Sequence, residues 1–222
     1  MSIGLLGNKI GMTQIFDLKG NVIPVTVIKC GPCYITQIKS ESICGYNAIQ
    51  LGYLELEANT KKLTKPELGH FSKVNLSPFR YLKEYPLSIS SSSAAANVPE
   101  VNVENYTIGQ KLTVNMFNIG EYINITGLTI GKGNLGNIKR NNFGRGPMSH
   151  GSKHHRLQGS MGAGTSPGRV FPGKKMPGRV GMTQCTIKGL EIIDIDLKEN
   201  LVIIKGSIPG KTGNLVSLIS AK

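Results

Sequence analysis

Residues 190–205 read LEIIDIDLKENLVIIK, and this stretch indicates the fold class of the whole chain. Two short runs rich in Ile, Val and Leu, Leu190–Asp196 and Leu201–Lys205, lie on either side of Glu199-Asn200. Apolar, β-branched runs that flank a turn-forming pair are typical of antiparallel strands joined by a tight turn. The stretch therefore predicts a β-hairpin.

The same pattern recurs across most of the chain. Short β-branched runs alternate with turns that contain Gly, Asn or Pro, and no long amphipathic helix is evident. The expected strands are Val22–Ile28, Tyr34–Lys39, Tyr46–Leu51, Lys111–Phe117, Tyr122–Thr129, Gln184–Ile187, Leu190–Asp196, Leu201–Lys205 and Leu215–Ile219. We therefore expect a mainly β, barrel-like body made from residues 1–59, 106–130 and 183–222. A chain of 222 residues is long enough to bury a substantial core.

Residues 60–105 differ from the body on both sides of them. They hold Pro66, Pro78 and Pro86 in a mixed pattern, and then the Ser/Ala-rich run Ser88–Ala96. We expect a small mixed α/β insertion here, with the Ser/Ala-rich run as a mobile surface loop.

The positive charge of the chain is concentrated in residues 131–182, which we call the arm. The whole chain has 26 Lys and Arg against 13 Asp and Glu, a net charge of +13. No Asp or Glu occurs between Glu121 and Glu191, so the ten Lys and Arg residues of the arm give it +10. The remaining 170 residues carry only +3. A charge of this sign and density predicts a polyanionic partner, and it marks where that partner binds.

The composition of the arm favours nucleic acid over a plain solvated loop. Its large apolar residues follow neither the helical nor the strand period, so it cannot build a core of its own. Solvated loops usually mix both signs of charge. Gly lets a main chain approach a phosphate backbone closely, and Arg forks onto phosphates or stacks on bases. We also expect the ends of the arm, near Thr129 and Thr183, to lie close together, because both continue into one barrel-like sheet.

The four cysteines, Cys30, Cys33, Cys44 and Cys185, are expected to be reduced. Cys30-Gly-Pro-Cys33 has the C-x-x-C spacing of a redox pair or of half a zinc site. A redox pair needs its first cysteine at a helix N-terminus, but strand-like runs lie on both sides here. Zinc would need two further ligands at a paired spacing. We expect a hairpin turn with free thiols, no metal site and no cofactor.

No catalytic site is expected. Gly206–Thr212 resembles a phosphate-binding P-loop, but it is one residue too short before the Gly-Lys pair, and a strand-like segment follows. His154 and His155 are adjacent, so they lack the spacing of zinc ligands on one helix face. The arm has no carboxylate for an acid/base pair. Asp194 and Asp196 are expected on a solvated sheet face. An RNA-acting enzyme or nucleotide-dependent factor is the alternative, and it would require nucleotide binding at Gly206–Thr212.

Membrane and export functions find no support in the sequence. The longest aliphatic runs, such as Leu201–Ile204, fall far short of the ~18–20 apolar residues of a membrane span. A membrane-surface protein would need a basic amphipathic helix, which the Gly-rich arm is not. Met1–Phe16 resembles neither a secretory signal nor a transit peptide, so we expect the protein to work where it is made. Lys outnumbers Arg 20 to 6, and Ile and Asn are frequent. This bias fits an AT-rich plastid genome, and an AT-rich bacterium fits nearly as well.

A series of short motifs runs in order along nearly the whole chain. They are GNKIGMTQIF (7–16), IPVTV (23–27), GYNAIQ (45–50), KPELGH (65–70), GKG (131–133), IKR (138–140), RGPMSHG (145–151), HR (155–156), GSMG (159–162), VF (170–171), GKK (173–175), PGR (177–179) and NLVIIKG (200–206). Together they resemble the large-subunit ribosomal protein L-three family, in its bacterial and organellar form. Two positions depart from the family pattern: Ala163 stands where many bacterial relatives carry Gln, and Asn134 stands where the family often has Phe.

This resemblance implies both a fold and a function. The fold would be a translation-factor-type β-barrel with a small mixed α/β insertion and a long basic extended loop. The protein would be a non-enzymatic, structural constituent of the large ribosomal subunit, acting in translation. It would bind large-subunit (23S-like) rRNA near its 3′ end, assist early subunit assembly and extend its arm towards the peptidyl-transferase centre. Its partners would be that rRNA and neighbouring large-subunit ribosomal proteins, with no membrane and no small-molecule substrate.

The candidate RNA-binding residues are cationic or histidine side chains, almost all of them in the arm. They are Lys132, Lys139, Arg140, Arg145, His150, Lys153, His154, His155, Arg156, Arg169, Lys174, Lys175, Arg179 and, as a weaker candidate, Lys9. We expect the arm to become ordered only when it binds RNA. Affinity should fall steeply with salt, because each phosphate contact releases counterions.

Overall fold

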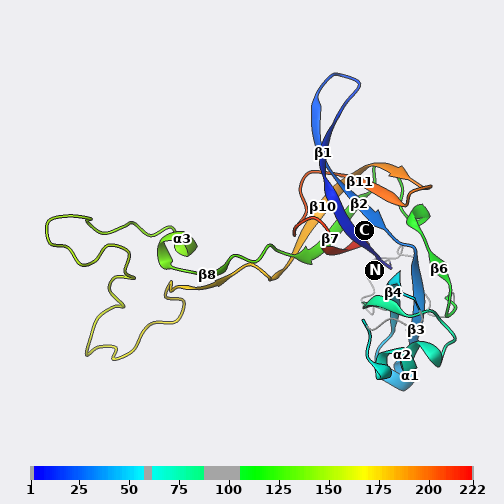
Figure 1. The fold of residues 1–222 in the computed structure, drawn as a ribbon, viewed down its shortest axis with the longest axis horizontal. Coiled ribbons are helices and arrows are strands. Elements are labelled where there is room, and N and C mark those ends of the chain that lie inside the picture. Colours follow the sequence, from blue (N-terminus) through cyan, green and yellow to red (C-terminus); the bar gives the residue numbers. More distant parts are fainter. Residues whose placement is uncertain (1–2, 58–61, 88–105, 222) are drawn as a thin grey trace, which may run out of the picture. The chain divides into compact units, whose positions relative to one another are not determined.

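Six antiparallel strands form the barrel of the fold, which is mainly β. The computed structural model describes residues 3–57, 62–87 and 106–221, so the run Ser88–Ala96 lies outside the described residues. The barrel strands are β1 (Leu5–Phe16), β2 (Val22–Cys30), β7 (Tyr122–Leu128), β10 (Gln184–Asp196), β11 (Leu201–Lys205) and β12 (Leu215–Ser220). Their order is β1-β12-β7-β10-β11-β2, and β2 pairs back with β1 to close the barrel. Figure 1 shows β1 and β2 as one long hairpin.

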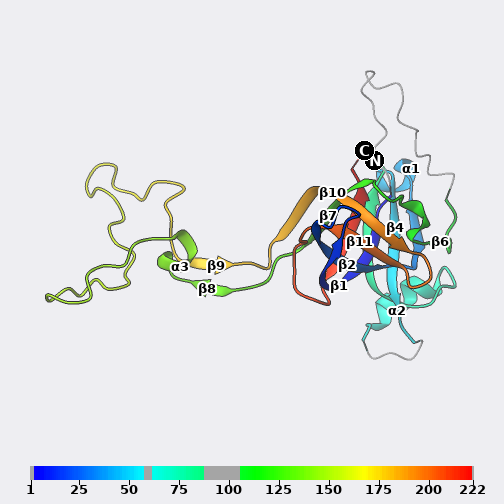
Figure 2. The same cartoon turned by 90° about the horizontal axis from the view of Figure 1, so that it is seen from above.

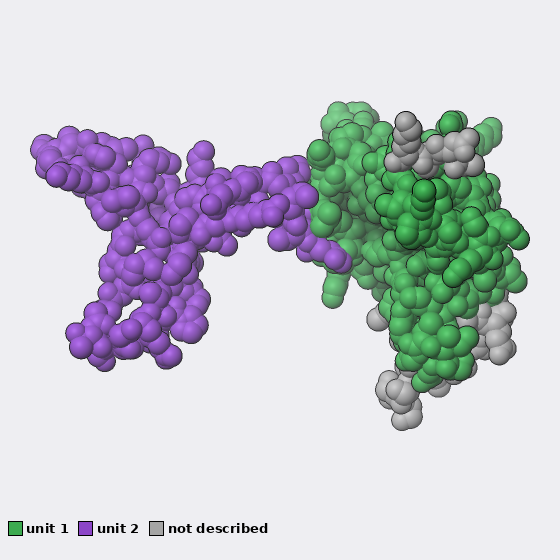
Figure 3. Space-filling model, turned by 60° about the horizontal axis from the view of Figure 1, so that its bottom comes forward, with its two compact units in different colours: residues 1–128, 185–222 green, residues 129–184 purple. Residues whose placement is uncertain are grey.

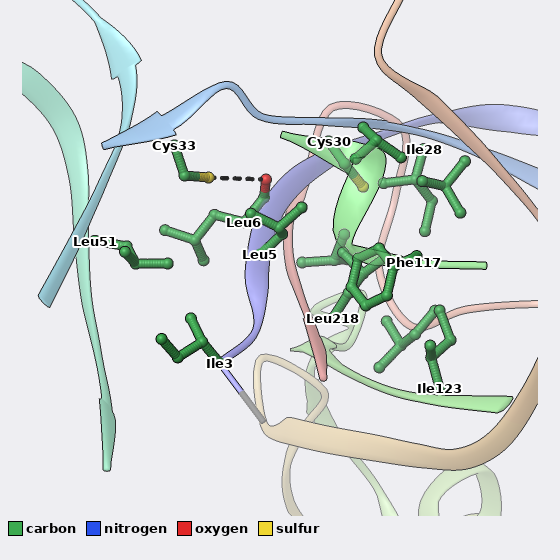
Figure 4. Packing of buried hydrophobic residues seen from close by; sticks show 14 of the residues in the cluster. Ile3, Leu5, Leu6, Ile28, Cys30, Cys33, Leu51, Phe117, Ile123 and Leu218 are labelled. Atoms are coloured by element: carbon green, nitrogen blue, oxygen red, sulfur yellow. Dashed lines mark hydrogen bonds between the residues drawn. The ribbon is translucent and has the colours of Figure 1, made fainter. Parts of the chain in front are cut away.

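The barrel interior follows from the alternation of side chains along each strand. In β7, Ile123 and Ile125 are buried while Tyr122 and Leu128 are exposed, the two-residue period of a strand with one buried face. The register of β12 on β7 sets Leu218 opposite Ile125. Figure 4 shows several of these side chains, including Leu5, Leu6 and Leu218, gathered in one cluster. Each fully buried aliphatic side chain contributes about 1.5–3 kcal/mol to folding.

A second sheet of four strands packs into the same core. Its order is β5 (Phe79–Pro86), β4 (Ala48–Glu55), β3 (Cys33–Lys39) and β6 (Lys111–Leu112). The Tyr85 hydroxyl of β5 is buried, lies 2.7 Å from the Ser217 hydroxyl of β12 and also donates to the Leu5 carbonyl oxygen. Short helices accompany this sheet: α1 (Glu41–Cys44), α2 (Lys65–Ser72) and the 3₁₀ helix η2 (Val114–Met116).

The helix α2 begins where the sequence supplies a capping box. The Glu67 carboxylate accepts hydrogen bonds from the Thr64 backbone N–H (2.7 Å) and from the Thr64 hydroxyl (2.9 Å), and Pro66 lies in the first turn. A Thr cap followed three residues later by Glu satisfies backbone donors that the first turn leaves free. Together with β5, this helix gives the described part of residues 60–105 its mixed α/β character.

The structure corrects several expected elements. The turn at Cys30–Cys33 is not a hairpin, because β2 lies in the barrel and β3 in the second sheet, so the Gly31-Pro32 turn links two sheets. Only Lys111–Leu112 of the expected strand Lys111–Phe117 is β, and η2 follows it. The runs Gln184–Ile187 and Leu190–Asp196 are parts of one strand, β10.

Two compact units make up the chain. Unit 1 comprises residues 1–128 and 185–222, and unit 2 comprises residues 129–184 (Figure 3). Unit 2 contains the strand pair β8 (Gly133–Leu135) and β9 (Gly178–Val180) and the short helix α3 (Asn137–Asn141). Figure 2 shows that most of the rest of unit 2 forms neither helix nor strand. Within the described ranges, no helix is long and apolar enough to cross a membrane.

Candidate nucleic-acid interface

The two ends of the arm meet in a short backbone ladder. The Thr129 N–H donates to the Thr183 carbonyl oxygen at 3.0 Å, and the Lys132 N–H donates to that of Val180 at 2.9 Å. Gly181 sits in this ladder at φ +81°, where an added Cβ would lie 2.0 Å from the Ile130 carbonyl oxygen, so only glycine fits. The expectation that the ends of the arm lie close together is confirmed.

Side chains of α3 hold the returning segment of the arm in place. The buried Asn137 donates through Nδ2 to the Lys175 carbonyl oxygen at 3.2 Å. Asn141 Nδ2 and Arg140 Nη1 both donate to the Met176 carbonyl oxygen, at 3.2 and 2.7 Å. These hydrogen bonds tie α3 to the returning segment of the arm. Sequence reasoning did not identify Asn137 and Asn141, although their spacing of four residues on one helix face was a usable signal.

The outer loop of the arm is also closed on itself. The Gly146 N–H donates to the His155 carbonyl oxygen at 3.1 Å, and His155 Nδ1 lies 3.0 Å from the Pro147 carbonyl oxygen. At Gly146 a Cβ would stand 1.9 Å from the His154 carbonyl oxygen, so the loop requires glycine at this point. The loop segments around residues 146 and 155 therefore lie directly against each other.

All thirteen candidate residues of the arm are exposed to solvent. They are Lys132, Lys139, Arg140, Arg145, His150, Lys153, His154, His155, Arg156, Arg169, Lys174, Lys175 and Arg179. Both ion pairs found in the described part of the chain, Lys39–Glu84 and Lys205–Glu191, lie in unit 1. Since the arm contains no Asp or Glu, its +10 charge has no internal counter-charge. Such a surface attracts a polyanion strongly at low ionic strength.

Lys9 is placed differently from the other candidates. It is 8% exposed, and its Nζ donates to the carbonyl oxygens of Ile208 and Gly210, each at 3.1 Å. An ammonium held inside the protein by two carbonyl dipoles is not free to reach a phosphate. The structure instead gives Lys9 a structural role, in which it holds the β11–β12 loop against β1.

That loop is the P-loop look-alike, and the structure supports its interpretation as a turn. Strand β12 follows it, where a phosphate-binding loop would lead into a helix. Its backbone is occupied by the protein itself, since the Gly206 carbonyl oxygen accepts from the Thr26 hydroxyl at 2.6 Å and the Gly206 N–H donates to the Pro24 carbonyl oxygen at 2.8 Å.

The Cys30 and Cys33 thiols are free and buried. Burial raises the pKa of Cys33 from 9 to about 12, and burial together with the neighbouring Cys33 raises the pKa of Cys30 well above its ordinary value. Thiols that stay protonated are poor nucleophiles and poor metal ligands. Figure 4 shows the Cys33 thiol directed at the Leu6 carbonyl oxygen, 3.6 Å away. Among the described residues, no three His, Cys, Asp or Glu side chains gather as a metal site requires.

Comparison of the sequence with known proteins identifies one family. The family model "Ribosomal protein L3" matches residues 94–200. The "Large ribosomal subunit protein uL3" of Trichormus variabilis is 51% identical over 222 residues, which cover 100% of this chain and 98% of the relative. The uL3c protein of Phaeodactylum tricornutum is 53% identical over 219 residues (99% of each chain), and that of Gracilaria tenuistipitata is 52% identical over 218 residues (98% and 99%).

These similarities extend over the barrel, the second sheet and the arm alike. The chain is therefore a non-enzymatic, structural protein of the large ribosomal subunit. It belongs to the ribosomal protein L3 (uL3) family, as the motif resemblance predicted.

Proposed function

We propose that this chain binds large-subunit rRNA through the arm and so joins separate parts of the rRNA during subunit assembly. The contacts are made near the 3′ end of the rRNA, early in assembly, and the arm extends towards the peptidyl-transferase centre. The observation that carries this proposal is the set of thirteen exposed cationic and histidine side chains on a segment without acidic residues.

The physical role of the arm is charge neutralisation in a narrow space. Phosphates of neighbouring RNA helices repel one another, and Lys and Arg side chains placed between them relieve that repulsion and release counterions. The shape and the unpaired bases of the RNA guide such binding more than a base code does. The glycines of the arm allow its backbone to follow the RNA closely.

The body, the insertion and the arm have separate roles in this proposal. Residues 1–59, 106–130 and 183–222 act as the body, a translation-factor-type barrel that contacts the subunit surface and neighbouring large-subunit proteins. Residues 60–105 form the insertion, and residues 131–182 bind rRNA. The partners are large-subunit rRNA and other ribosomal proteins, without a membrane or a small-molecule substrate.

Shortening the arm tests the proposal. Leu135 and Gly178 are opposite each other in the β8–β9 pair, so replacing residues 136–177 by Asn-Gly closes the pair with a two-residue turn. We expect the shortened protein to keep a cooperatively folding barrel while its affinity for large-subunit rRNA falls at least 100-fold. The dependence of affinity on salt should become much shallower as well. An unchanged affinity and salt slope, measured by filter binding at 50–300 mM salt, would show that the arm is not the RNA-binding element.

We place the protein in plastid ribosomes, with the ribosomes of a bacterial cytoplasm as the alternative. The relatives above come from a cyanobacterium and from algal plastids (uL3c), and the Lys-rich composition fits an AT-rich genome. Sedimentation of large subunits from isolated plastids in moderate salt, followed by detection of this chain by mass spectrometry, distinguishes the two locations.

A further inference from the structure

A cavity of about 310 Å³ lies within the arm, between α3 and the outer loop. Its lining residues are Asn134, Leu135, Gly136, Ile138, Lys139 and Arg156. Five of them come from the β8–α3 segment, and Arg156 comes from the loop segment that is bonded to Gly146. The arm therefore contains a pocket that is partly open to solvent, in addition to its exposed cations.

The lining combines two kinds of chemistry. Leu135 and Ile138 are half-buried apolar residues, whereas Lys139 and Arg156 are exposed cations for which the structure shows neither an ion pair nor a hydrogen bond. Small-ligand sites in proteins are typically ~300–1,000 Å³ in volume, with apolar walls and a few convergent polar groups. This cavity lies at the small end of that range. An apolar wall beside two cations suits a planar ring that carries a phosphate.

We propose that this cavity binds a single unpaired nucleotide of the RNA, with its base against Leu135 and Ile138 and its phosphate on Lys139 and Arg156. This inference rests on the proposed function, because it takes RNA as the partner of the arm, and it adds a specific subsite to that general contact. Sequence-specific RNA recognition commonly takes unpaired bases that are turned out of the stack, while paired bases stay hidden inside the helix. The surrounding positive charge of the arm favours a nucleotide within a polyanion over a free nucleotide.

A bulky side chain at Gly136 tests the cavity without any change of charge. Gly136 lines the cavity at φ −69° and ψ 163°, a conformation open to any residue, and an added Cβ would meet nothing within 4 Å. We expect Gly136→Leu to abolish the chemical protection of at least one unpaired rRNA nucleotide that the unchanged protein protects. We also expect a loss of affinity of about 3- to 10-fold. Chemical probing of large-subunit rRNA with the full-length protein gives the first readout, and filter binding gives the second.

Two matched controls separate the cavity from general effects of substitution. Gly136→Ser adds little bulk at the same helix N-cap and should keep the protection. Gly144→Leu adds the same bulk at another open glycine of the arm that does not line the cavity, and it should also bind normally. The double variant Lys139→Ala/Arg156→Ala should lose the protected nucleotide and also lower the salt slope by about 1.4–1.8, the value for two phosphate contacts.

The outcomes distinguish this inference from the function on which it rests. Full protection by Gly136→Leu would overturn the nucleotide subsite, while the 136–177 replacement would still abolish binding if the arm binds rRNA. An unchanged affinity of that shortened protein would overturn both. If millimolar nucleoside monophosphate displaced the protection, and Gly136→Leu abolished nucleotide binding, the cavity would be a free-nucleotide site and the RNA assignment would be wrong.

Discussion

Units 1 and 2 are stabilised by different means. Unit 1 buries more than twenty apolar side chains around one core that extends from the barrel into the second sheet. Unit 2, in which every residue is described, buries a single side chain, that of Asn137. Its form depends on a backbone ladder at its base and on the amide bonds of α3. Unit 1 is therefore stabilised mainly by apolar burial, whereas unit 2 has hydrogen bonds and no apolar core.

The largest effect should come from truncating a core side chain of unit 1. Leu218 is fully buried in β12 between β1 and β7. Leu218→Ala should lower the free energy of unfolding by about 2–5 kcal/mol, through lost burial and the cavity left behind. Phe171→Ala in the arm, where the ring is 60% exposed, should change it by less than about 0.5 kcal/mol. Urea unfolding of both full-length variants measures the contrast, and equal costs would contradict it.

The next effect is on binding and should be confined to unit 2. Replacing Lys174, Lys175 and Arg179 with Ala removes three exposed cations of the arm. If each contacts a phosphate, the salt slope should fall by about 2–3 and the affinity for rRNA by roughly 100-fold at 0.15 M salt. The unfolding free energy should not change.

A body variant with the same loss of charge provides the control for that experiment. Lys19, Lys188 and Lys198 are exposed residues of unit 1. Their replacement with Ala should leave the slope nearly unchanged. Equal loss of affinity in the two triple variants would show that net charge, and not the arm, determines binding.

Substitution of Lys9 should lower stability and leave rRNA affinity nearly unchanged, the opposite of substituting the arm lysines. Lys9→Met keeps the length of the side chain but leaves the carbonyl oxygens of Ile208 and Gly210 without their donor. We expect a loss of about 2 kcal/mol of stability, since hydrogen bonds to charged groups contribute ~1.5–3 kcal/mol. The rRNA affinity at low temperature should stay within about twofold. A large loss of affinity in a fully folded Lys9→Met protein would restore Lys9 as an RNA contact.

The smallest effect concerns pH and the buried thiols of unit 1. The pKa of Cys33 is raised to about 12 and that of Cys30 is raised as well, so the folded state keeps both protonated where the unfolded chain ionises. This contribution is complete well below the ordinary thiol pKa of 9, and it is lost as the pH rises through that value towards the folded-state pKa. Unfolding free energy should thus fall by about 1–2 kcal/mol between pH 8 and pH 9.5. A Cys30→Ala/Cys33→Ala protein should show a flatter profile, and an equally steep one would assign the effect to other groups.

The strands that sequence alone reveals are those with unbroken β-branched runs. Thus Val22–Ile28 and Leu201–Lys205 lie within β2 and β11. Strand β1 was not predicted, because Gly7 and Gly11 interrupt its pattern. In the barrel an added Cβ at Gly7 would lie 2.7 Å from the Lys29 carbonyl oxygen, so glycine allows close strand contact there. Strand β5, FRYLKEYP, was hidden by its charged residues, which suit the sheet edge that it forms.

The features of the candidate site also differ in how far local sequence predicts them. Charge and glycine content are local properties, so the sequence located the arm and its exposed cations. The contacts of Asn137 with Lys175 and of Arg140 with Met176 join residues 36 or more positions apart, and no local pattern reports such pairs. The burial of Lys9 could not be predicted for a similar reason, since the carbonyl oxygens that accept from its ammonium lie about 200 residues further along the chain.

The pairing of β1 with β12 also governs the order in which the molecule can be built during synthesis. One edge of β1 pairs with β2, the next strand along the chain, but Leu5 is registered against Leu218, so the other edge is covered only when almost the entire chain has been made. Residues 131–182 leave the ribosome that makes them earlier than β12 does. A nascent chain therefore presents its basic segment while the barrel is still open, and the backbone groups on the β12-facing edge of β1 stay unpaired until the last strand emerges.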